Sequence, residues 1–315
     1  MAQITPFRLR ALLAALESTE GQDESPTPGT HAILLINGEG RIETEQLERE
    51  IDYPYFTGRP FVRTNQRAMI SGDIELLGAE TVGDDPPIDA ILQAAGHAKT
   101  VIEDNGSPVA VEYNPIAQDI PSLTAYWYHG GERMRALGCR IGIERIRAEI
   151  NNYCTASIEI QGNPEEIDEQ DLPEDLDYSA FQEPVAVSTE SLTVELDDKK
   201  LDAISVDHEL SPDLTQVEHS EGRATYLSDR GSSGTLRIYR PAKEHIDIRK
   251  LVEDHERVPL LVTIAGGEGR SVELEMPGIQ MQDPQRTEVD GLVAWDIPYV
   301  AVADEGNDDY LIRFK

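Results

Sequence analysis

The chain has 315 residues, which is enough for two domains of ordinary size. Its 27 basic and 60 acidic residues give a formal net charge of −33, and the sequence carries no cluster of basic residues. Because affinity for a phosphate backbone depends on clustered Lys and Arg, these figures argue against tight binding of nucleic acid. The apolar residues lie in periodic runs, which argues against general disorder.

The N-terminal segment, residues 1–21, carries two arginines and a short apolar run from Ala11 to Leu16. The run is too brief for the core of a secretory signal, so we expect a short amphipathic helix. No segment reaches the roughly 18 to 20 apolar residues that are needed to span a bilayer. The sequence therefore predicts a soluble protein without a membrane partner.

Hairpin signals recur along the rest of the chain. Asn37–Gly38, Gly130–Gly131 and Gly266–Gly267 each lie between two apolar or alternating runs, and their residue types accept the positive φ angles of tight turns. Short helices are expected after Pro86–Pro87 and after Pro241. We therefore predict a mainly β protein in which each half carries one helix against a sheet.

An irregular loop is expected from Asp52 to Asn65. It combines two prolines with four aromatic residues: Tyr53, Tyr55, Phe56 and Phe61. Exposed aromatic side chains on a long loop would indicate a contact with another protein. Packing onto the parent domain is the alternative, and the sequence leaves both open.

A strongly acidic segment lies near the middle of the chain. Eight of the fourteen residues from Pro164 to Asp177 are acidic, and two are proline. Such a segment buries too little apolar surface to offset its ordering entropy, so we expect a linker or a solvated loop. A calcium loop is the alternative, but the alternating Asp/Asn pattern with a central Gly is absent. The predicted domains are residues 1–177 and 178–315.

The two halves present similar elements in the same order, which suggests a tandem duplication. Asn37 and Asp197 differ by 160 positions, and the same offset places the apolar residues of the first expected helix on the second. Past the helix the offset falls to about 137, as for Leu123 and Leu260. The difference corresponds to an additional loop at about residues 98–121 in the first half.

Signs of catalytic chemistry are sparse. His208, His245 and His255 lack the spacing of a helical zinc site, and the glycine-rich stretches lack the spacing of a phosphate loop. Cys139 and Cys154 are expected to be buried free thiols, as in a reducing compartment, since no Cys-x-x-Cys motif is present. We therefore expect no catalytic residue, no metal and no cofactor.

Two long stretches resemble the major tail tube proteins of bacteriophages with long non-contractile tails. They read "SGDIELLGAETVGDDPPIDAILQAAGHAKTV" and, after a short gap, "VEYNPIAQDIPSLTAYWYHGGERMRALGCRIG". "LSDRGSSGTLRI" is similar to the C-terminal half of the same proteins, whereas Cys139 and Ile141 depart from the family pattern. The positions that carry the resemblance are Ile91, Leu92, Ala94, Gly96, Val111, Glu112, Tyr113, Pro115, Ser122, Thr124, Tyr126, Tyr128, Gly131, Leu137 and Gly138.

The resemblance implies a β-sandwich or barrel-like domain with one flanking helix, present twice. It also implies rings stacked into a hollow tube around a tape-measure protein, capped by tail terminator and tail tip proteins. Genomic DNA would pass through the lumen without specific binding, helped by acidic side chains that repel phosphates. The expected location is the virion tail, after assembly in the host cytoplasm.

Symmetry follows from the duplication. If a ring holds six tube domains and each chain supplies two, three chains close it, and we favour this trimer over a ring of six chains. Residues 52–65 and the N-terminal helix are expected to bridge successive rings. The alternatives are a soluble binding module from a salt-adapted cell and a β-rich hydrolase that uses carboxylates.

Overall fold

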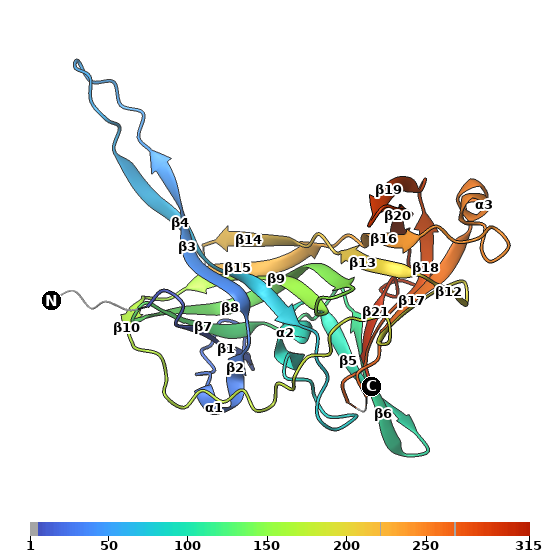
Figure 1. Cartoon of the computed structure of the whole chain (residues 1–315). Coiled ribbons are helices and arrows are strands. Elements are labelled where there is room, and N and C mark those ends of the chain that lie inside the picture. The colour runs from blue at the N-terminus through green and yellow to red at the C-terminus, as the bar shows by residue number, and fades with distance from the viewer. Residues whose placement is uncertain (1–5, 221, 268) are drawn as a thin grey trace.

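The computed structural model describes residues 6–220, 222–267 and 269–315, and over these ranges the protein is mainly β, with three short helices (Figure 1). The elements up to residue 169 are β1 (Arg10–Leu16), α1 (Pro28–His31), β2 (Ala32–Ile33), β3 (Ile36–Glu48), β4 (Phe61–Glu75), α2 (Asp89–Ala94), β5 (His97–Asp104), β6 (Ser107–Pro115), β7 (Leu123–His129), β8 (Glu132–Glu149), β9 (Thr155–Pro164) and β10 (Asp168–Glu169).

The remaining elements follow from residue 192 onward. They are β11 (Leu192–Leu196), β12 (Lys199–Leu201), β13 (Ala203–Glu209), β14 (Asp213–His219), β15 (Gly222–Asp229), β16 (Ser233–Tyr239), α3 (Ile248–Glu253), β17 (Arg257–Ile264), β18 (Val272–Met281), β19 (Gln285–Val289), β20 (Leu292–Ala301) and β21 (Leu311–Phe314).

Each half forms an antiparallel series of strands. In the first half the pairing order is β2–β1–β7–β8–β9–β4–β3. In the second half it is β12–β11–β17–β18–β20–β16–β13. β18 and then β19 pair with the same edge of β20. Two further hairpins are formed by β5 with β6 and by β14 with β15.

Two strand pairings join the halves. The last part of the long strand β8 pairs with β13, from Ser205 opposite Glu149 to Glu209 opposite Arg145. The C-terminal strand β21 lies between β18 and β6. As a result 19 strands form one hydrogen-bonded sheet, and one cluster of buried apolar residues extends through both halves. The expected division into domains at residue 177 stays a prediction.

Several expected elements are confirmed. Gly130–Gly131 forms the two-residue turn between β7 and β8, with both φ angles positive. Gly266–Gly267 lies in the connection between β17 and β18, and α2 and α3 follow the expected prolines. Residues 98–121, expected to be a loop, instead form largely the hairpin of β5 and β6. Alternation also holds, since Ala156, Ile158 and Ile160 of β9 are buried.

The expected N-terminal helix is wrong in the described part of that segment. Residues 1–5 lie outside the described residues, and Arg10–Leu16 forms the strand β1, paired with β2 on one side and β7 on the other. Residues 11–15 are all buried, as expected for a strand that is covered on both faces. A short apolar run fits such a strand and a buried helix equally well, and here the pairing partners decide.

The hairpin turn expected at Asn37–Gly38 is also wrong. These residues lie near the start of β3, where the register with β4 shifts between Ile36 and Glu39. Asn37 has a φ of 53°, so the dipeptide forms a bulge instead of a turn. The strand continues beyond it to Glu48. A residue pair that accepts positive φ therefore kinks this strand without reversing it.

The acidic segment at residues 164–177 is packed against the first half. Its two-residue strand β10 pairs with the start of β8, and Leu172 and Leu176 pack beside buried Tyr126 and Tyr128. We call residues 168–178 the strap, because this stretch runs along the outside of the first half (Figure 1). The few apolar residues among the carboxylates are what fix it. Most of residues 164–177 lie outside strands and are exposed, as expected for a solvated loop, and Leu172 and Leu176 anchor this loop to the first half.

Candidate assembly surfaces

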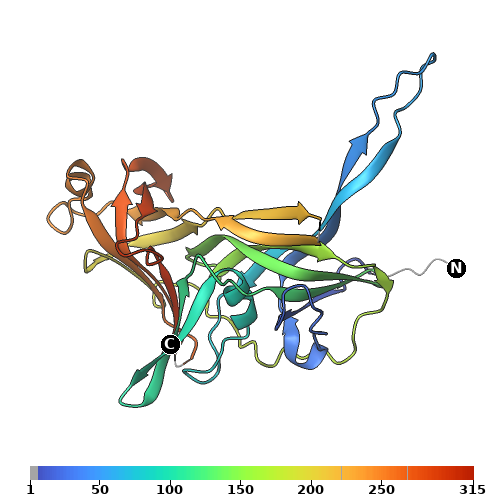
Figure 2. The ribbon, with the colours of Figure 1, turned by 180° about the vertical axis from the view of Figure 1, so that it is seen from behind.

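A long hairpin projects from the body of the molecule, as Figures 1 and 2 show from opposite sides. β4 pairs with β9 only from Ala68 onward, so residues 61–67 pair, among the described strands, with residues 43–48 of β3 alone. We call residues 43–67 the arm. Polar residues at most positions on both faces suit this ribbon, because both faces meet solvent.

Ion pairs hold the base of the arm in register. Arg67 of β4 lies 2.8 Å from the Glu43 carboxylate of β3, and Arg41 lies 2.9 Å from the same group. Hydrogen bonds from these two arginines lower the pKa of Glu43. Nearer the tip, the Arg49 amide donates to the Pro60 carbonyl at 2.9 Å. The arm is thus an ordered ribbon up to residue 49, and the remaining residues form its tip.

The four aromatic residues predicted as a contact site all lie on the arm, and their side chains are exposed. Phe56 at the tip is fully exposed, and Tyr55 is 63% exposed. Tyr53 and Tyr55 stack on each other with ring centroids 5.4 Å apart, while Phe61 begins β4. The alternative, packing onto the parent domain, does not describe these side chains. Exposed aromatic rings at the end of a projecting hairpin are typical of a surface that contacts another protein.

Among the strands with an edge unpaired within the described residues, β3 belongs to the first half and β19 to the second. β3 pairs with β4 on one side only, and β19 pairs with β20 on one side only. Exposed apolar residues accompany both edges: Leu34 and Ile36 at the start of β3, and Leu292 and Val293 beside β19. An edge strand of this kind can pair with a strand of another chain.

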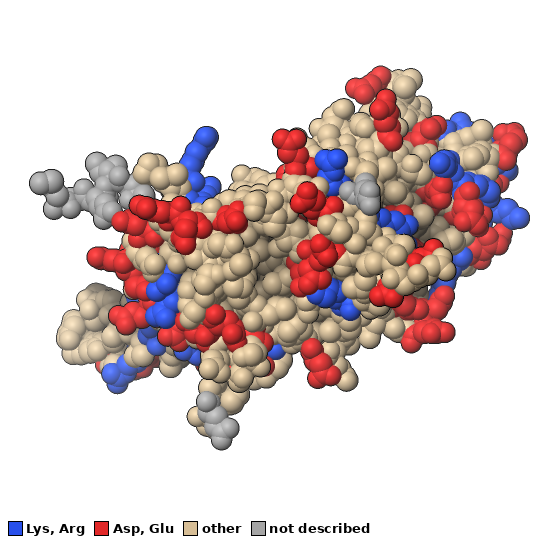
Figure 3. All heavy atoms as spheres, turned by 90° about the horizontal axis from the view of Figure 1, so that it is seen from below, with Lys and Arg blue, Asp and Glu red and all other residues tan. Residues whose placement is uncertain are grey.

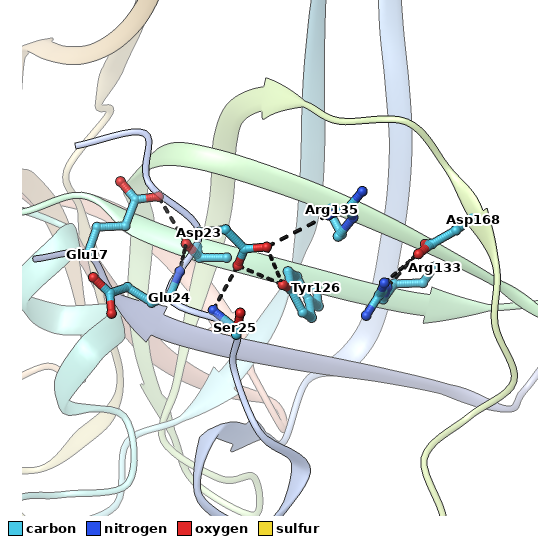
Figure 4. Close-up of polar contacts among 9 residues, drawn as sticks. Glu17, Asp23, Glu24, Ser25, Tyr126, Arg133, Arg135 and Asp168 are labelled. Atoms are coloured by element: carbon cyan, nitrogen blue, oxygen red, sulfur yellow. Dashed lines mark hydrogen bonds and ion pairs between the residues drawn. The ribbon is translucent and has the colours of Figure 1, made fainter. Parts of the chain in front are cut away.

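Much of the acidity near the N-terminus is used within the chain (Figure 4). Tyr126 donates its hydroxyl to Asp23 at 2.6 Å, the Ser25 amide donates to Asp23 at 2.7 Å, and Arg135 lies 3.8 Å from the same carboxylate. Burial, reinforced by Asp23, raises the pKa of Tyr126 to about 12. This carboxylate therefore fastens residues 18–25 onto β7 and β8.

A second ion pair fastens the strap. The guanidinium group of Arg133 in β8 donates two hydrogen bonds, one to each carboxylate oxygen of Asp168 in β10. Its guanidinium carbon also lies 4.8 Å from the centroid of the Tyr126 ring. The hydrogen bond from Arg133 lowers the pKa of Asp168. Elsewhere the carboxylates are spread over the face shown in Figure 3, with basic residues among them. Acidic side chains here serve structure in some places and remain solvated in others.

A buried polar cluster lies where the two halves meet. His97 of β5 donates from Nδ1 to the Leu92 carbonyl at 3.0 Å, which leaves Nε2 to accept the Tyr310 hydroxyl at 2.8 Å. The ring of His208 in β13 lies against Tyr310, with centroids 5.2 Å apart. Beside them Arg230 binds Asp309 through two hydrogen bonds of 2.8 and 2.9 Å. Burial lowers the pKa of both histidines to about 4.

In the part of the chain that the structure describes, no group of residues is arranged for metal binding or for chemistry at a thiol. No group of three or more His, Cys, Asp and Glu residues is placed to hold a metal ion there. Cys139 and Cys154 are buried free thiols, as expected, and burial raises the pKa of each, for Cys154 to about 12. None of the described helices has the length and apolar character needed to cross a membrane.

Some surface features escaped the sequence-based predictions although signals for them exist. Asp290–Gly291 forms the tight turn between β19 and β20, and Asn105–Gly106 forms the turn between β5 and β6, each with positive φ at both positions. Both are dipeptides that favour tight hairpin turns. Four of the five basic residues around α3 lie within residues 240–250, where acidic residues stand among them, and only Arg286 is distant in the sequence.

Comparison of the chain with models of known protein families and with curated proteins finds no match. The functional conclusion therefore depends on the surfaces just described: a projecting aromatic arm, two free strand edges, and a polar cluster between two joined halves.

Proposed function

We propose that this chain is a structural virion protein that polymerises into stacked rings and so forms the hollow tail tube of a virus with a long non-contractile tail. The observation that carries the proposal is the junction between the halves. It joins one half to the other by strand pairing and leaves a related edge free in each half, at β3 and at β19. A unit of this kind continues by adding further copies until the ring closes.

We further propose that the halves are tandem copies of one β-sandwich or barrel-like domain. The two pairing orders become identical when β1, β2, β3, β4, β7, β8 and β9 are matched with β11, β12, β13, β16, β17, β18 and β20. In both series a single short helix follows the fourth matched strand. The hairpin of β5 and β6 is then an insertion in the first copy.

Two glycines support the same matching. A Cβ on Gly72 of β4 would lie 2.9 Å from the carbonyl oxygen of Ile36, and a Cβ on Gly234 of β16 would lie 2.4 Å from the carbonyl oxygen of Asp207. Each glycine belongs to a Ser-Gly pair at the matched position and faces the matched neighbouring strand, β3 or β13. Close approach of two backbones excludes a side chain at both places.

The matching indicates how one copy of the chain would meet the next. Within the chain, the last part of β8 pairs with β13. In the proposed matching, β18 corresponds to β8 and β3 corresponds to β13. β19, which continues the line of β18 beside β20, therefore takes the place of the last part of β8, and the start of β3 takes the place of β13. We propose that β19 of one copy pairs with the start of β3 of the next. Leu292 and Val293 would then meet Leu34 and Ile36, and apolar surface at both ends would be buried.

In this arrangement three chains supply six domains and close a ring with exact three-fold and approximate six-fold symmetry. A ring of six chains is the alternative, in which the second half would decorate the outside. The arm, with Tyr53, Tyr55, Phe56 and Phe61, would contact the neighbouring ring. With β1 fixed in the sheet, the N-terminal segment has no helix in its described part to serve the same purpose.

The remaining partners follow from the tube. A tape-measure protein would fill the lumen during assembly, terminator and tip proteins would close the ends, and DNA would pass through at ejection. An acidic lumen repels phosphates, which accounts for part of the charge of −33. The tube would assemble in the host cytoplasm and act in the virion tail.

Electron microscopy and mass measurement of the purified chain test the proposal. We expect hollow rings or tubes as the protein concentration rises, and a ring mass of three times 34.9 kDa. A ring of six chains would contradict the three-chain arrangement but keep the tube. A persistent monomer over the whole concentration range would contradict the function itself.

A further inference from the structure

A pocket of about 690 Å³ lies between α3 and the strands β19 and β20. Five basic and three acidic residues line it, a difference of +2 in a chain whose net charge is −33. The expectation that this protein has no basic cluster therefore holds for the sequence and not for the folded chain. The basic residues are Arg240, Lys243, Arg249, Lys250 and Arg286, and Trp295 lines the pocket beside them.

The three arginines of the pocket lack an anionic partner among the described residues. Within the described ranges, no carboxylate lies at ion-pair distance from Arg240, Arg249 or Arg286, whereas Lys243 and Lys250 pair with Asp247 and Asp254. This is notable in a chain with more than twice as many acidic as basic residues. Three like charges around one pocket repel each other until an anion enters, so the site is electrostatically prepared for a negative group.

Trp295 of β20 forms the floor of this cluster. The guanidinium carbons of Arg249 and Arg240 lie 5.7 and 6.0 Å from the centroid of its ring, and Arg286 is its cross-strand neighbour in β19. The Trp295 side chain is more than nine-tenths buried, and its Nε1–H has no acceptor among the described residues. A buried donor without a partner is costly, so an acceptor brought by a ligand would be stabilising here.

The matching position in the first half is covered. There Cys154, directly before β9, lies in the interior, in a small cavity that it shares with Val206, Val262 and Ile264 of the second half. In the second half the corresponding end remains open at the α3 pocket, beside the free edge of β19. If the junction within the chain is repeated between chains, the first half of the next copy comes to lie over this pocket.

We propose that the α3 pocket binds a carboxylate-bearing segment of the next copy of this chain, with Arg240, Arg249 and Arg286 as the cationic ligands. The inference rests on the proposed ring, which brings a second copy to this end. We identify the occupant by its charge, because the surface of any neighbouring copy is rich in Asp and Glu. The planar guanidinium group binds a carboxylate well because it can donate two parallel hydrogen bonds to it.

Zero-length cross-linking with a carbodiimide tests the occupant, because Lys243 and Lys250 line the pocket and the chain has only six lysines. Rings would be assembled from equal amounts of ¹⁴N- and ¹⁵N-labelled protein, cross-linked, and analysed by mass spectrometry. We expect mixed-isotope peptides that join Lys243 or Lys250 to Asp or Glu residues of the first half. Links to the chain's own Asp247 and Asp254 alone would overturn the proposal.

Charge reversal gives the second test. Arg249→Glu and Arg286→Glu change exposed residues, so folding should be unaffected, and each should raise the concentration at half-maximal ring formation by about tenfold or more. Arg270→Glu, an exposed arginine away from the pocket, is the matched control and should leave it unchanged. Equal behaviour of all three variants in a protein that still forms rings overturns the pocket and keeps the tube; failure of the unaltered chain to assemble overturns both.

Discussion

At the scale of single residues, His97 and His208 make the join between the halves sensitive to acid. Both are buried with a pKa of about 4, against 6.5 for an unperturbed side chain. As the pH falls below 6.5 the unfolded chain binds protons at these positions and the folded chain does not, so stability is lost between about pH 6.5 and pH 4. At pH 5 the loss is about 2 kcal/mol for each histidine.

Urea unfolding at pH 7.5 and pH 5 checks this prediction. The whole-chain trend also contains the titration of many carboxylates, so the quantity to compare is the change with pH relative to a variant. The double variant His97→Gln/His208→Gln should lose less stability than the unaltered protein on acidification. His255→Asn, an exposed histidine with positive φ, is the control and should follow the unaltered protein. If the double variant does so as well, the histidines are not responsible.

At the scale of elements, the arm offers a direct test because its tip makes few contacts with the body. Replacing Tyr55 and Phe56 by Ser should leave the thermal unfolding temperature within about a degree, because surface substitutions cost little. Rings should still form, but tubes should not grow, since the aromatic contact between rings is gone. Lengths of negatively stained particles provide the measurement.

Tyr153→Ser is the matched control for the arm, because it removes an exposed aromatic side chain elsewhere. Deleting residues 53–61 is the stronger version of the same change and should give the same result. Tubes of normal length from either arm variant would show that successive rings meet through other surfaces.

The elements also show how far the sequence alone leads. Alternation and glycine dipeptides predicted β7, β8, β9, β17 and β18, because those signals are local. β1 was not predicted, because the apolar run Ala11–Leu16 has no periodicity that distinguishes a buried strand from a buried helix. Its pairing with β2 and β7 in the fold makes it a strand. The bulge at Asn37 escaped for a similar reason: positive φ permits a turn, but the long pairing with β4 overrides it.

The candidate surfaces divide in the same way. Tyr53, Tyr55, Phe56 and Phe61 could be proposed from the sequence because four aromatic residues near two prolines are a local signal. The complete α3 pocket could not, because Arg286 of β19 is distant in the sequence from Arg240 and Arg249, and only the fold brings the three together. The spacing of residues in the sequence can predict a site that lies within one element. A site formed by several strands of a sheet can be predicted only when the order of the strands is known.

At the scale of the whole molecule, a head-to-tail ring makes a prediction that a two-fold dimer does not. Each copy has two different edges, the start of β3 with Ile36 and β19 with Val293 beside it, and in the proposed ring each junction would use one of each. Ile36→Glu damages the first end and Val293→Glu the second. Both positions are exposed, so each variant should fold but fail to assemble, because a buried unpaired carboxylate would be left at every junction.

A mixture of the two variants should behave differently from either alone. The intact β19 end of Ile36→Glu can join the intact β3 end of Val293→Glu, but the resulting pair exposes only damaged ends and cannot grow. We therefore expect a species of about twice 34.9 kDa by light scattering, and no rings. Val217→Glu, exposed on β14, should assemble normally. Dimers from one variant alone would require an interface in which both copies present the same surface, and rings from the mixture would require junctions that form at a damaged end. Either outcome would overturn the head-to-tail arrangement through these two edges.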